Sequence, residues 1–229
     1  MRKIGIVTIG QAPRPDVVPE MQRVLGDDVT ILERGALDGH TIEMVRNLKA
    51  GPGESVLATR MRDGTETLVP HDHVVPEVQR CIAELENTGV ELTLVLCTGG
   101  FPTFVSKRLV VYPSDILRGA VRGAIRRGRL AIVQPTIEQI AREERGKPVR
   151  KPAQWGEDVE VVYDAVSPYG PDADVEEMAE RIRQAEVDLV FLNCMGFSSK
   201  QKAIVERKTG KPVIQSNTLV ARVLKELLD

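Results

Sequence analysis

The sequence is short of several features that would assign it to a class at once. It has three cysteines in 229 residues, and its amino terminus is typical of a strand rather than of an export signal, so we expect reduced thiols in the cytoplasm. No apolar run approaches the ~20 residues of a membrane-spanning helix. The net charge of −2 gives no reason to expect nucleic acid or a membrane surface as a partner. Neither Gly-x-Gly-x-x-Gly nor Gly-Lys-Ser/Thr follows the first predicted strand, which argues against NAD or ATP.

The sequence does contain two similar apolar segments that each lead to a cysteine. Residues 92–100 are LTLVLCTGG, and residues 188–196 are DLVFLNCMG. A short apolar run bounded by glycine predicts a buried parallel strand, so we expect Cys97 and Cys194 at the carboxyl ends of two strands. Open α/β sheets bind their ligands at that edge. The two thiols are therefore the leading candidates for a functional site.

Predicted strands and helices alternate along nearly the whole chain, which indicates an α/β fold with helices on both faces of parallel sheets. The order strand, helix, strand, helix and cysteine-bearing strand occurs twice. We therefore predict two similar lobes, each a mostly parallel four-stranded sheet flanked by helices, with a cleft between them at the strand carboxyl ends. The first lobe covers residues 1–113 with the closing helix 215–229, and the second covers residues 114–214. If each lobe carries its cysteine at this edge, the thiols face each other across the cleft.

Local patterns give more specific predictions. Asp16 is expected to cap the first helix. Further helices are expected over residues 40–50 and from residue 137 to about residue 145. The Lys/Pro-rich residues 146–156 are expected to form a surface connection.

The cysteine motifs LVLCTGGF and VFLNCMGFS resemble the aspartate/glutamate racemase superfamily. Three further segments resemble the AroM family, which is placed near that superfamily. They are TIGQAPRPDV at 8–17, ILERGALDG at 31–39 and the turn RDGT at 62–65. The Asp-Gly of that turn, between two extended runs, also predicts a hairpin. The likeness covers almost the whole chain. The closing VIQSNTLV at 213–220 is similar to the Ser-Asn segment that opens the last helix in maleate isomerase-like members.

The resemblance implies a cofactor-independent racemase, isomerase or lyase that acts on a small carboxylic acid. The superfamily also includes hydantoin racemases, maleate isomerase and arylmalonate decarboxylase, and in its chemistry Cys97 and Cys194 would act as base, nucleophile or acid. Glycine turns at helix starts would bind the carboxylate oxygens. The candidates for substrate binding follow predicted strands or open helices, and they are Gln11, Arg14, Thr98, Gly99, Gly100, Gln134, Thr136, Asn193, Met195, Gly196, Ser198, Ser216 and Asn217.

Three positions depart from the amino-acid racemases. Thr98 and Met195 stand where many of those enzymes have Asn and Thr, and Gly10-Gln11 offers no match for their acidic residue near the end of the first strand. These differences argue against amino-acid racemisation in particular. They also motivate a second hypothesis, a non-catalytic or regulatory protein that binds a small carboxylate with the same fold. The substrate, the role of each thiol and the oligomeric state stay open, with a homodimer among the alternatives.

Each thiol also has a structural interpretation. Cys97 and Cys194 could be small core hydrophobes, or they could form a disulfide if the cleft closes tightly, although no oxidising compartment is indicated. Cys81 lies in an amphipathic helix, where packing is the expected role. No Cys-x-x-Cys and no histidine pair with ligand spacing lies beside either candidate thiol, so zinc is not expected.

Two polar motifs are open to more than one interpretation. His71-Asp72-His73 could bind a metal, because a strand would place both histidines on one face. Asp72 before an apolar run favours the cap of a helix instead. Arg14 is a surface residue by default, and an anion-binding residue otherwise.

Overall fold

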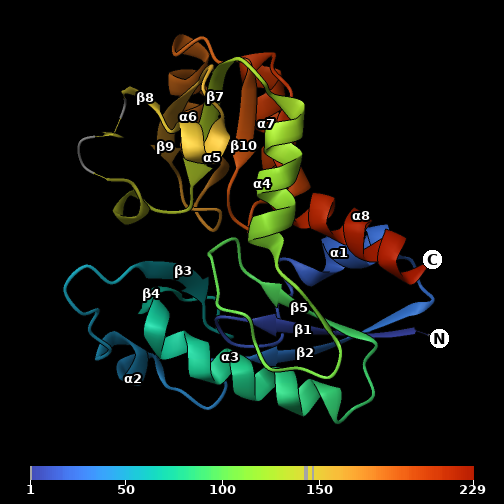
Figure 1. Cartoon of the computed structure of the whole chain (residues 1–229). Coiled ribbons are helices and arrows are strands. Elements are labelled where there is room, and N and C mark those ends of the chain that lie inside the picture. The colour runs from blue at the N-terminus through green and yellow to red at the C-terminus, as the bar shows by residue number, and fades with distance from the viewer. Residues whose placement is uncertain (1, 142–143, 146) are drawn as a thin grey trace. The chain divides into compact units, whose positions relative to one another are not determined.

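The computed structural model describes residues 2–141, 144–145 and 147–229 (Figure 1). The chain divides into two compact units, Met1–Ser114 with Ala221–Asp229, and Asp115–Val220. Each unit is built on a mostly parallel sheet with helices packed against it, so the predicted α/β class and the two-lobed architecture are confirmed. Among the described residues, no helix is long and apolar enough to cross a membrane.

The sheet of the first unit has four parallel strands in the order β2-β1-β5-β6. Thr8, the last residue of β1, pairs with Gly35 of β2 and with Leu96 of β5. These three strands therefore end at the same edge, and the residues after Thr8 and after Leu96 emerge close together. The strands are β1 (Arg2–Thr8), β2 (Val29–Gly35), β5 (Leu92–Leu96) and β6 (Leu109–Val111).

Helix α3 (His71–Glu86) packs along this sheet (Figure 1). Its apolar side joins strand residues in one core, because a 3.6-residue period places these positions on one face; they are Val74, Val78, Cys81, Ile82 and Leu85. The strands β3 (Val56–Arg60) and β4 (Glu66–Pro70) precede α3 and form an antiparallel pair. Gly64 in their turn has a φ of +92°, which glycine tolerates best, so the predicted hairpin is confirmed.

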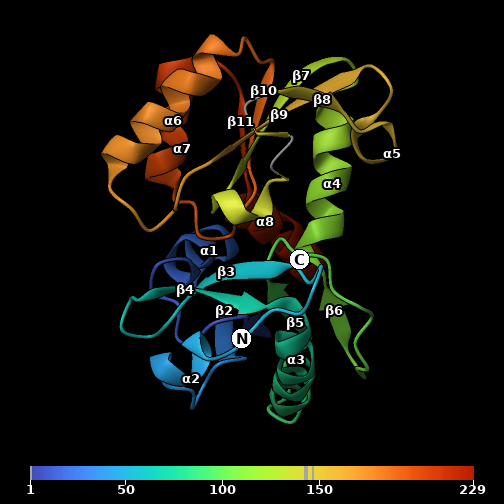
Figure 2. The ribbon, with the colours of Figure 1, turned by 90° about the vertical axis from the view of Figure 1, so that its left-hand side faces the viewer.

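The sheet of the second unit has five strands in the order β11-β10-β7-β9-β8. Four strands are parallel, as predicted, and the fifth, β8, is an antiparallel edge strand beside β9. Helices α6 (Asp172–Gln184) and α7 (Ser199–Thr209) pack side by side and share the core of this unit (Figure 2). The strands are β7 (Gly128–Gln134), β8 (Pro148–Arg150), β9 (Val159–Ala165), β10 (Leu189–Leu192) and β11 (Val213–Gln215).

Two helices are shared between the units. The first unit ends at Ser114, inside α4 (Pro113–Ala124), and the second ends at Val220, inside α8 (Ser216–Leu228). The chain therefore passes from one unit to the other through helical segments.

Two predicted helix starts are wrong. Helix α1 (Val18–Leu25) has Val17 at its N-cap, because the carboxylate of Asp16 is bonded to the guanidinium of Arg14. Asp72 does not cap α3 either. Strand β4 runs directly into that helix, so Pro70 is the N-cap residue and Asp72 lies within the first turn.

The helix predicted over residues 40–50 is shorter than expected. Helix α2 (Ile42–Arg46) begins after Thr41, whose hydroxyl accepts the N–H of Met44. It ends before the sequence Gly-Pro-Gly at 51–53, and Gly53 has a φ of +78°. Glycine and proline disfavour continuation of a helix.

The helix predicted from residue 137 to about 145 is also wrong over the residues described. A single 3₁₀ turn, η1 (Ile137–Gln139), is formed instead. The guanidinium of Arg145 donates to the carbonyls of Ile137 and Ile140, so these carbonyls are bonded to a side chain. Residues 142 and 143 of the predicted helix lie outside the described residues.

The predicted surface connection at 146–156 contains regular structure. It supplies the edge strand β8 and the short helix α5 (Pro152–Trp155), and residue 146 lies outside the described residues. The three residues of β8 pair with the amino-terminal half of β9. Prolines at 148 and 152 are compatible with an edge strand and with the first turn of a helix.

Candidate functional site

Cys97 lies directly after β5 and opens a turn with Thr98, Gly99 and Gly100. The sulfur is partly exposed, and the backbone N–H of Gly99 points at it, with 3.3 Å between N and Sγ. The carbonyl of Gly100 at the end of this turn lies 2.8 Å from Nε2 of His71. The predicted position of Cys97 at a strand end is confirmed.

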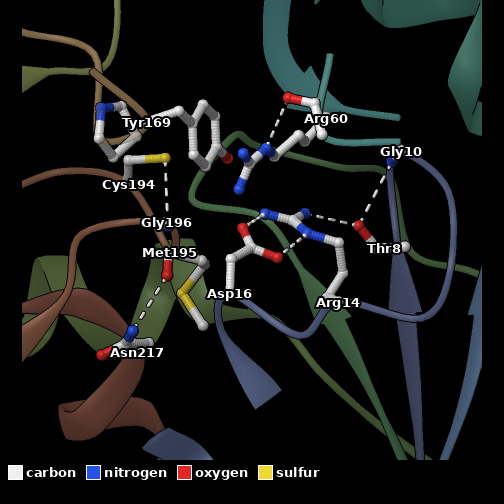
Figure 3. A network of polar contacts seen from close by, with 12 residues as sticks. Thr8, Gly10, Arg14, Asp16, Arg60, Tyr169, Cys194, Met195, Gly196 and Asn217 are labelled. Carbon is white, nitrogen blue, oxygen red and sulfur yellow. Dashed lines mark hydrogen bonds and ion pairs between the residues drawn. The ribbon is translucent and has the colours of Figure 1, made fainter. Parts of the chain in front are cut away.

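Cys194 lies two residues after β10 and has the same kind of amide donor. The backbone N–H of Gly196 points at its sulfur, with 3.4 Å between N and Sγ (Figure 3). Cys194 is more buried than Cys97, with 9% of its surface exposed. Each unit therefore holds a cysteine at the end of a central parallel strand, with a glycine amide two residues later directed at the sulfur. A hydrogen bond of this kind favours the thiolate over the thiol.

Buried polar side chains fix the turn that contains Cys194. The amide nitrogen of Asn217 donates to the carbonyls of Met195 and Phe197 at 3.1 and 3.0 Å, and the first of these bonds is drawn in Figure 3. The hydroxyl of Ser216 donates to the carbonyl of Leu192 at 2.7 Å. Ser216 and Asn217 are fully buried, so their donors hold the backbone of the turn.

Ser198 joins this turn to α7. Its hydroxyl accepts the N–H of Gln201, and the side chain of Gln201 accepts the N–H of Ser198, which forms a capping box. A capping box satisfies two amide groups of the first helical turn reciprocally. The sequence predicted Ser198 as a donor near the thiol, and the structure gives it the additional role of N-cap.

Tyr169, which the sequence reasoning missed, covers Gly196. A Cβ atom added at Gly196 would lie 2.8 Å from the phenolic oxygen and 2.9 Å from a ring carbon of Tyr169, and the ring lies beside Cys194 and Gly196 in Figure 3. The residue follows β9, a neighbour of β7 in the same sheet. The candidates predicted in this lobe follow three other strands, and Tyr169-Gly170 after the predicted strand 159–165 was the available signal.

Two candidates join the ends of neighbouring strands in the second unit. The side-chain amide of Asn193 donates to the side-chain oxygen of Gln134 at 3.1 Å, which links the end of β10 to the end of β7. Thr136 donates to Glu138 within η1, and this bond holds the pKa of Glu138 below its ordinary value. Thr136 therefore has a local partner two residues away.

In the first unit, Gln11 connects three segments. Its amide nitrogen donates to the carbonyls of Leu37 and His40 at 3.1 and 2.8 Å, and its oxygen accepts the N–H of Arg62 at 2.9 Å. Gln11, His40 and Arg62 also form part of the wall of a hollow of about 460 Å³. The side chain of Gln11 therefore ties the end of β1 to the loop after β2 and to the hairpin turn.

The default expectation of a surface position for Arg14 is wrong, because only 5% of this residue is exposed. Its guanidinium forms two hydrogen bonds with the carboxylate of Asp16, at 2.9 and 2.7 Å, and a third with the hydroxyl of Thr8 at 2.9 Å (Figure 3). Burial alone would raise the pKa of Asp16, but the hydrogen bonds and charge of Arg14 lower it overall. Arg14 thus holds a protein carboxylate beside the end of β1.

Glu33 completes this network and was also missed from the sequence. Its carboxylate accepts the backbone N–H of Arg14 at 2.7 Å. Burial raises the pKa of Glu33 against the opposing effect of that bond. Glu33 lies near the end of β2. The sequence of this parallel strand alone does not indicate whether its side chain faces the protein or solvent.

Cys81 is a core residue, as predicted. It is fully buried in the cluster under α3, and burial raises its pKa to about 11. Among the described residues, no group of three or more His, Cys, Asp or Glu side chains is arranged to hold a metal ion.

The model of the AroM protein family matches residues 4–228 of this chain, whereas a search of curated proteins gave no match. Solved structures share the fold. Picrophilus torridus aspartate racemase is 15% identical, over 99% of this chain and 94% of that chain, with a TM-score of 0.56. Allantoin racemase from Klebsiella pneumoniae is 12% identical, over 100% and 88%, with a TM-score of 0.62. A cysteine-to-serine variant of Nocardia farcinica maleate cis-trans isomerase, with a covalently bound succinylcysteine intermediate, is 18% identical, over 100% and 93%, with a TM-score of 0.59.

Proposed function

The chain belongs to the AroM family, and from that premise we propose that it is a cofactor-independent racemase, isomerase or lyase that acts on a small carboxylic acid through Cys97 and Cys194. The fold it shares with two racemases and an isomerase supports this class of activity. The observation that carries the proposal is the repeated thiol geometry. Each sulfur stands at the end of a parallel strand and accepts a glycine N–H, at 3.3 Å in one unit and 3.4 Å in the other.

In a racemisation, one thiolate removes the proton from the carbon next to the substrate carboxylate. The electron pair of the broken C–H bond moves into the carboxylate as an enolate, and the second thiol returns a proton to the opposite face. The glycine amides favour the thiolate that starts the reaction, because a hydrogen bond to an ionised acceptor is about twice as strong as one between neutral groups. The expectation that the two thiols share one cleft stays a prediction.

In a cis-trans isomerisation, the thiolate adds to an alkene instead. A sulfur–carbon bond forms, the π electron pair moves to the neighbouring carbon beside a carboxylate, and the new single bond rotates before the thiolate leaves again. The succinylcysteine of the Nocardia farcinica isomerase is a covalent intermediate on a cysteine, and we extend that chemistry to this chain as the second route.

We assign carboxylate binding to the turns that follow the two cysteines, including Thr98 and the backbone of residues 194–198. Ser216 and Asn217 act on the substrate through the turn, because their donors are bonded to its carbonyls. Preformed hydrogen-bond donors stabilise a developing enolate most strongly where water is excluded. The chain's partner is then a small carboxylate, with neither nucleic acid nor a membrane involved, and a homodimer is one form of the enzyme to test.

Two observations favour a second candidate, a protein that binds a small carboxylate without turnover. Cys194 is largely buried, and Arg14, a cation that follows β1, is paired with Asp16. This candidate predicts thermal stabilisation by carboxylates, no exchange of substrate hydrogen, and thiols that alkylate like ordinary cysteines, with a midpoint near pH ~8.5.

The test is the separate replacement Cys97→Ser and Cys194→Ser, with Cys81→Ala as the matched control in the core. Each protein is incubated in D₂O with a panel of hydroxy, amino and unsaturated dicarboxylic acids, and deuterium incorporation and isomer ratio are measured. We expect activity in the wild type and the control, and a loss of at least ~10³-fold in each serine variant. Full activity of both serine variants would refute the role of the thiols. Binding without turnover in the wild type would establish the second candidate.

A further inference from the structure

The motif His71-Asp72-His73 is not used by the proposed chemistry, yet its first residue contacts the turn that holds Cys97. Nε2 of His71 lies 2.8 Å from the carbonyl oxygen of Gly100, and Nδ1 lies 3.0 Å from a carboxylate oxygen of Asp72. The imidazole also contacts the ring of Phe101 at a tilt of 34°, with 5.2 Å between ring centroids. A single side chain therefore connects the first turn of α3 to the end of the Cys97 turn.

Both partners of the His71 ring are oxygen atoms that can only accept hydrogen bonds. A neutral imidazole carries one N–H and can donate to one of them, which would direct the lone pair of the other nitrogen at an oxygen. The carbonyl of Gly100 has no hydrogen to donate, so the bond between this oxygen and the ring requires a proton on Nε2.

We propose that His71 is a positioning residue of the Cys97 site, and that it holds the Cys97–Gly100 turn by a hydrogen bond from Nε2–H, with the ring oriented by Asp72. This inference deepens the proposed function and rests on it for its catalytic meaning. Nε2–H fixes the carbonyl of Gly100, which in turn fixes the chain on the carboxyl side of Gly99. The amide of Gly99 is the donor to the sulfur, so the ring acts on the thiolate through the backbone of the turn.

The backbone that carries His71 is fixed against the preceding loop. The backbone N–H of Asp72 donates to the carboxylate of Glu54 in that loop at 2.9 Å. The backbone N–H of His71 donates to the carbonyl of Ser55 at 3.0 Å. The ring of His71 therefore starts from an anchored position at the beginning of α3.

The hydrogen bond to Gly100 is tested directly by NMR. Long-range ¹H–¹⁵N spectra of the histidine rings are assigned with His71→Gln. We expect a proton on Nε2 of His71, because the carbonyl of Gly100 can only accept a hydrogen bond. A ring whose Nε2 carries no proton would overturn the proposal.

The positioning role is tested by alkylation of Cys97 with iodoacetamide, quantified on the Cys97 peptide by mass spectrometry as a function of pH. His71→Ala should move the profile to higher pH by about one unit, a roughly tenfold loss of rate at pH 7, as expected for one lost hydrogen bond. His71→Gln keeps a neutral donor and should recover part of the loss. His73→Gln, two residues further along α3, is the control and should match the wild type.

An unchanged alkylation profile in both His71 variants would refute the positioning role. Neither the NMR nor the alkylation measurement requires turnover. The positioning role can therefore fail while the Cys97→Ser assay still supports catalysis, and it can hold if that assay fails. In an active enzyme, His71→Gln should lower kcat more than it changes KM, because the bond acts on the thiolate and not on the bound substrate.

Discussion

The buried ion pair at the end of β1 gives the sharpest prediction of the structure. In Asp16→Asn, Arg14 keeps its bond to Thr8 but loses the carboxylate that accepts two of its N–H groups. Removal of one partner from a buried pair costs about 3–5 kcal/mol. Since Asp16 retains 15% exposure of its side chain, we expect the lower end, about 3 kcal/mol at pH 7. That loss corresponds to a decrease in Tm of roughly 6–12 °C for a chain of this length.

The pH dependence of the same variant provides an independent check. The pKa of Asp16 is lowered in the folded protein relative to its ordinary value of 3.8. The stabilisation from the ionised carboxylate is therefore fully present above pH 3.8 and is lost as the pH falls through the lower, folded-state value. The difference in unfolding free energy between wild type and Asp16→Asn should stay constant from pH 7 to about pH 4 and then shrink.

The assay is urea unfolding followed by circular dichroism at a series of pH values, with Asp115→Asn in the first turn of α4 as a surface control. A loss below about 1 kcal/mol at pH 7 would place the pair in the range of solvent-exposed ion pairs and refute the assignment of a buried network. A difference that grows as the pH falls below 4 would contradict the lowered pKa of Asp16.

Two further predictions concern the neighbouring turns. Gly196→Ala places a Cβ against the ring of Tyr169 and should destabilise the protein by about 1–3 kcal/mol in thermal unfolding. The control is Gly100→Ala, whose Cβ would meet no described atom within 4 Å. Equal Tm values for the two variants would contradict the close approach of Gly196 and Tyr169. Glu33→Gln should raise the Tm at pH 7. Burial raises the pKa of Glu33 above its ordinary value of 4.5. The stabilisation that comes from the raised pKa is therefore fully present below pH 4.5 and is lost as the pH rises through the folded-state value. A gain that persists at pH 3 would contradict this sign.

The sequence predicted the frame of the molecule and the position of both thiols. Apolar runs such as 92–96 are long enough for one strand and bounded by glycine, so their type and their ends follow from local chemistry. The same argument placed Cys97 and Cys194 at strand ends, because the residue after a buried run falls at the edge of the sheet. The hairpin at 62–65 followed from the preference of Asp-Gly for tight turns.

The features that failed depend on hydrogen bonds of individual side chains, which hydrophobic patterns and turn preferences do not indicate. Arg14 is buried because it meets Asp16 and Thr8 once β1 and its following loop are in place, which no local pattern of charge indicates. A 3₁₀ turn at 137–139 forms in place of the predicted helix, and the guanidinium of Arg145 donates to the carbonyls of Ile137 and Ile140. His71 was noticed, but its partner at Gly100 lies 29 residues away.

The core position of Cys81 has a practical consequence for every experiment on the sulfur chemistry of this protein. With a thiol that ionises only near pH 11 and full burial beneath α3, it is shielded from water-borne electrophiles as long as the first unit is folded. An adduct on Cys81 then marks a molecule whose β1–β5 core has opened, and the fraction of chains that carry it measures unfolding. Alkylation of Cys81 therefore reports unfolding in the same sample in which the reactivity of Cys97 and Cys194 is measured.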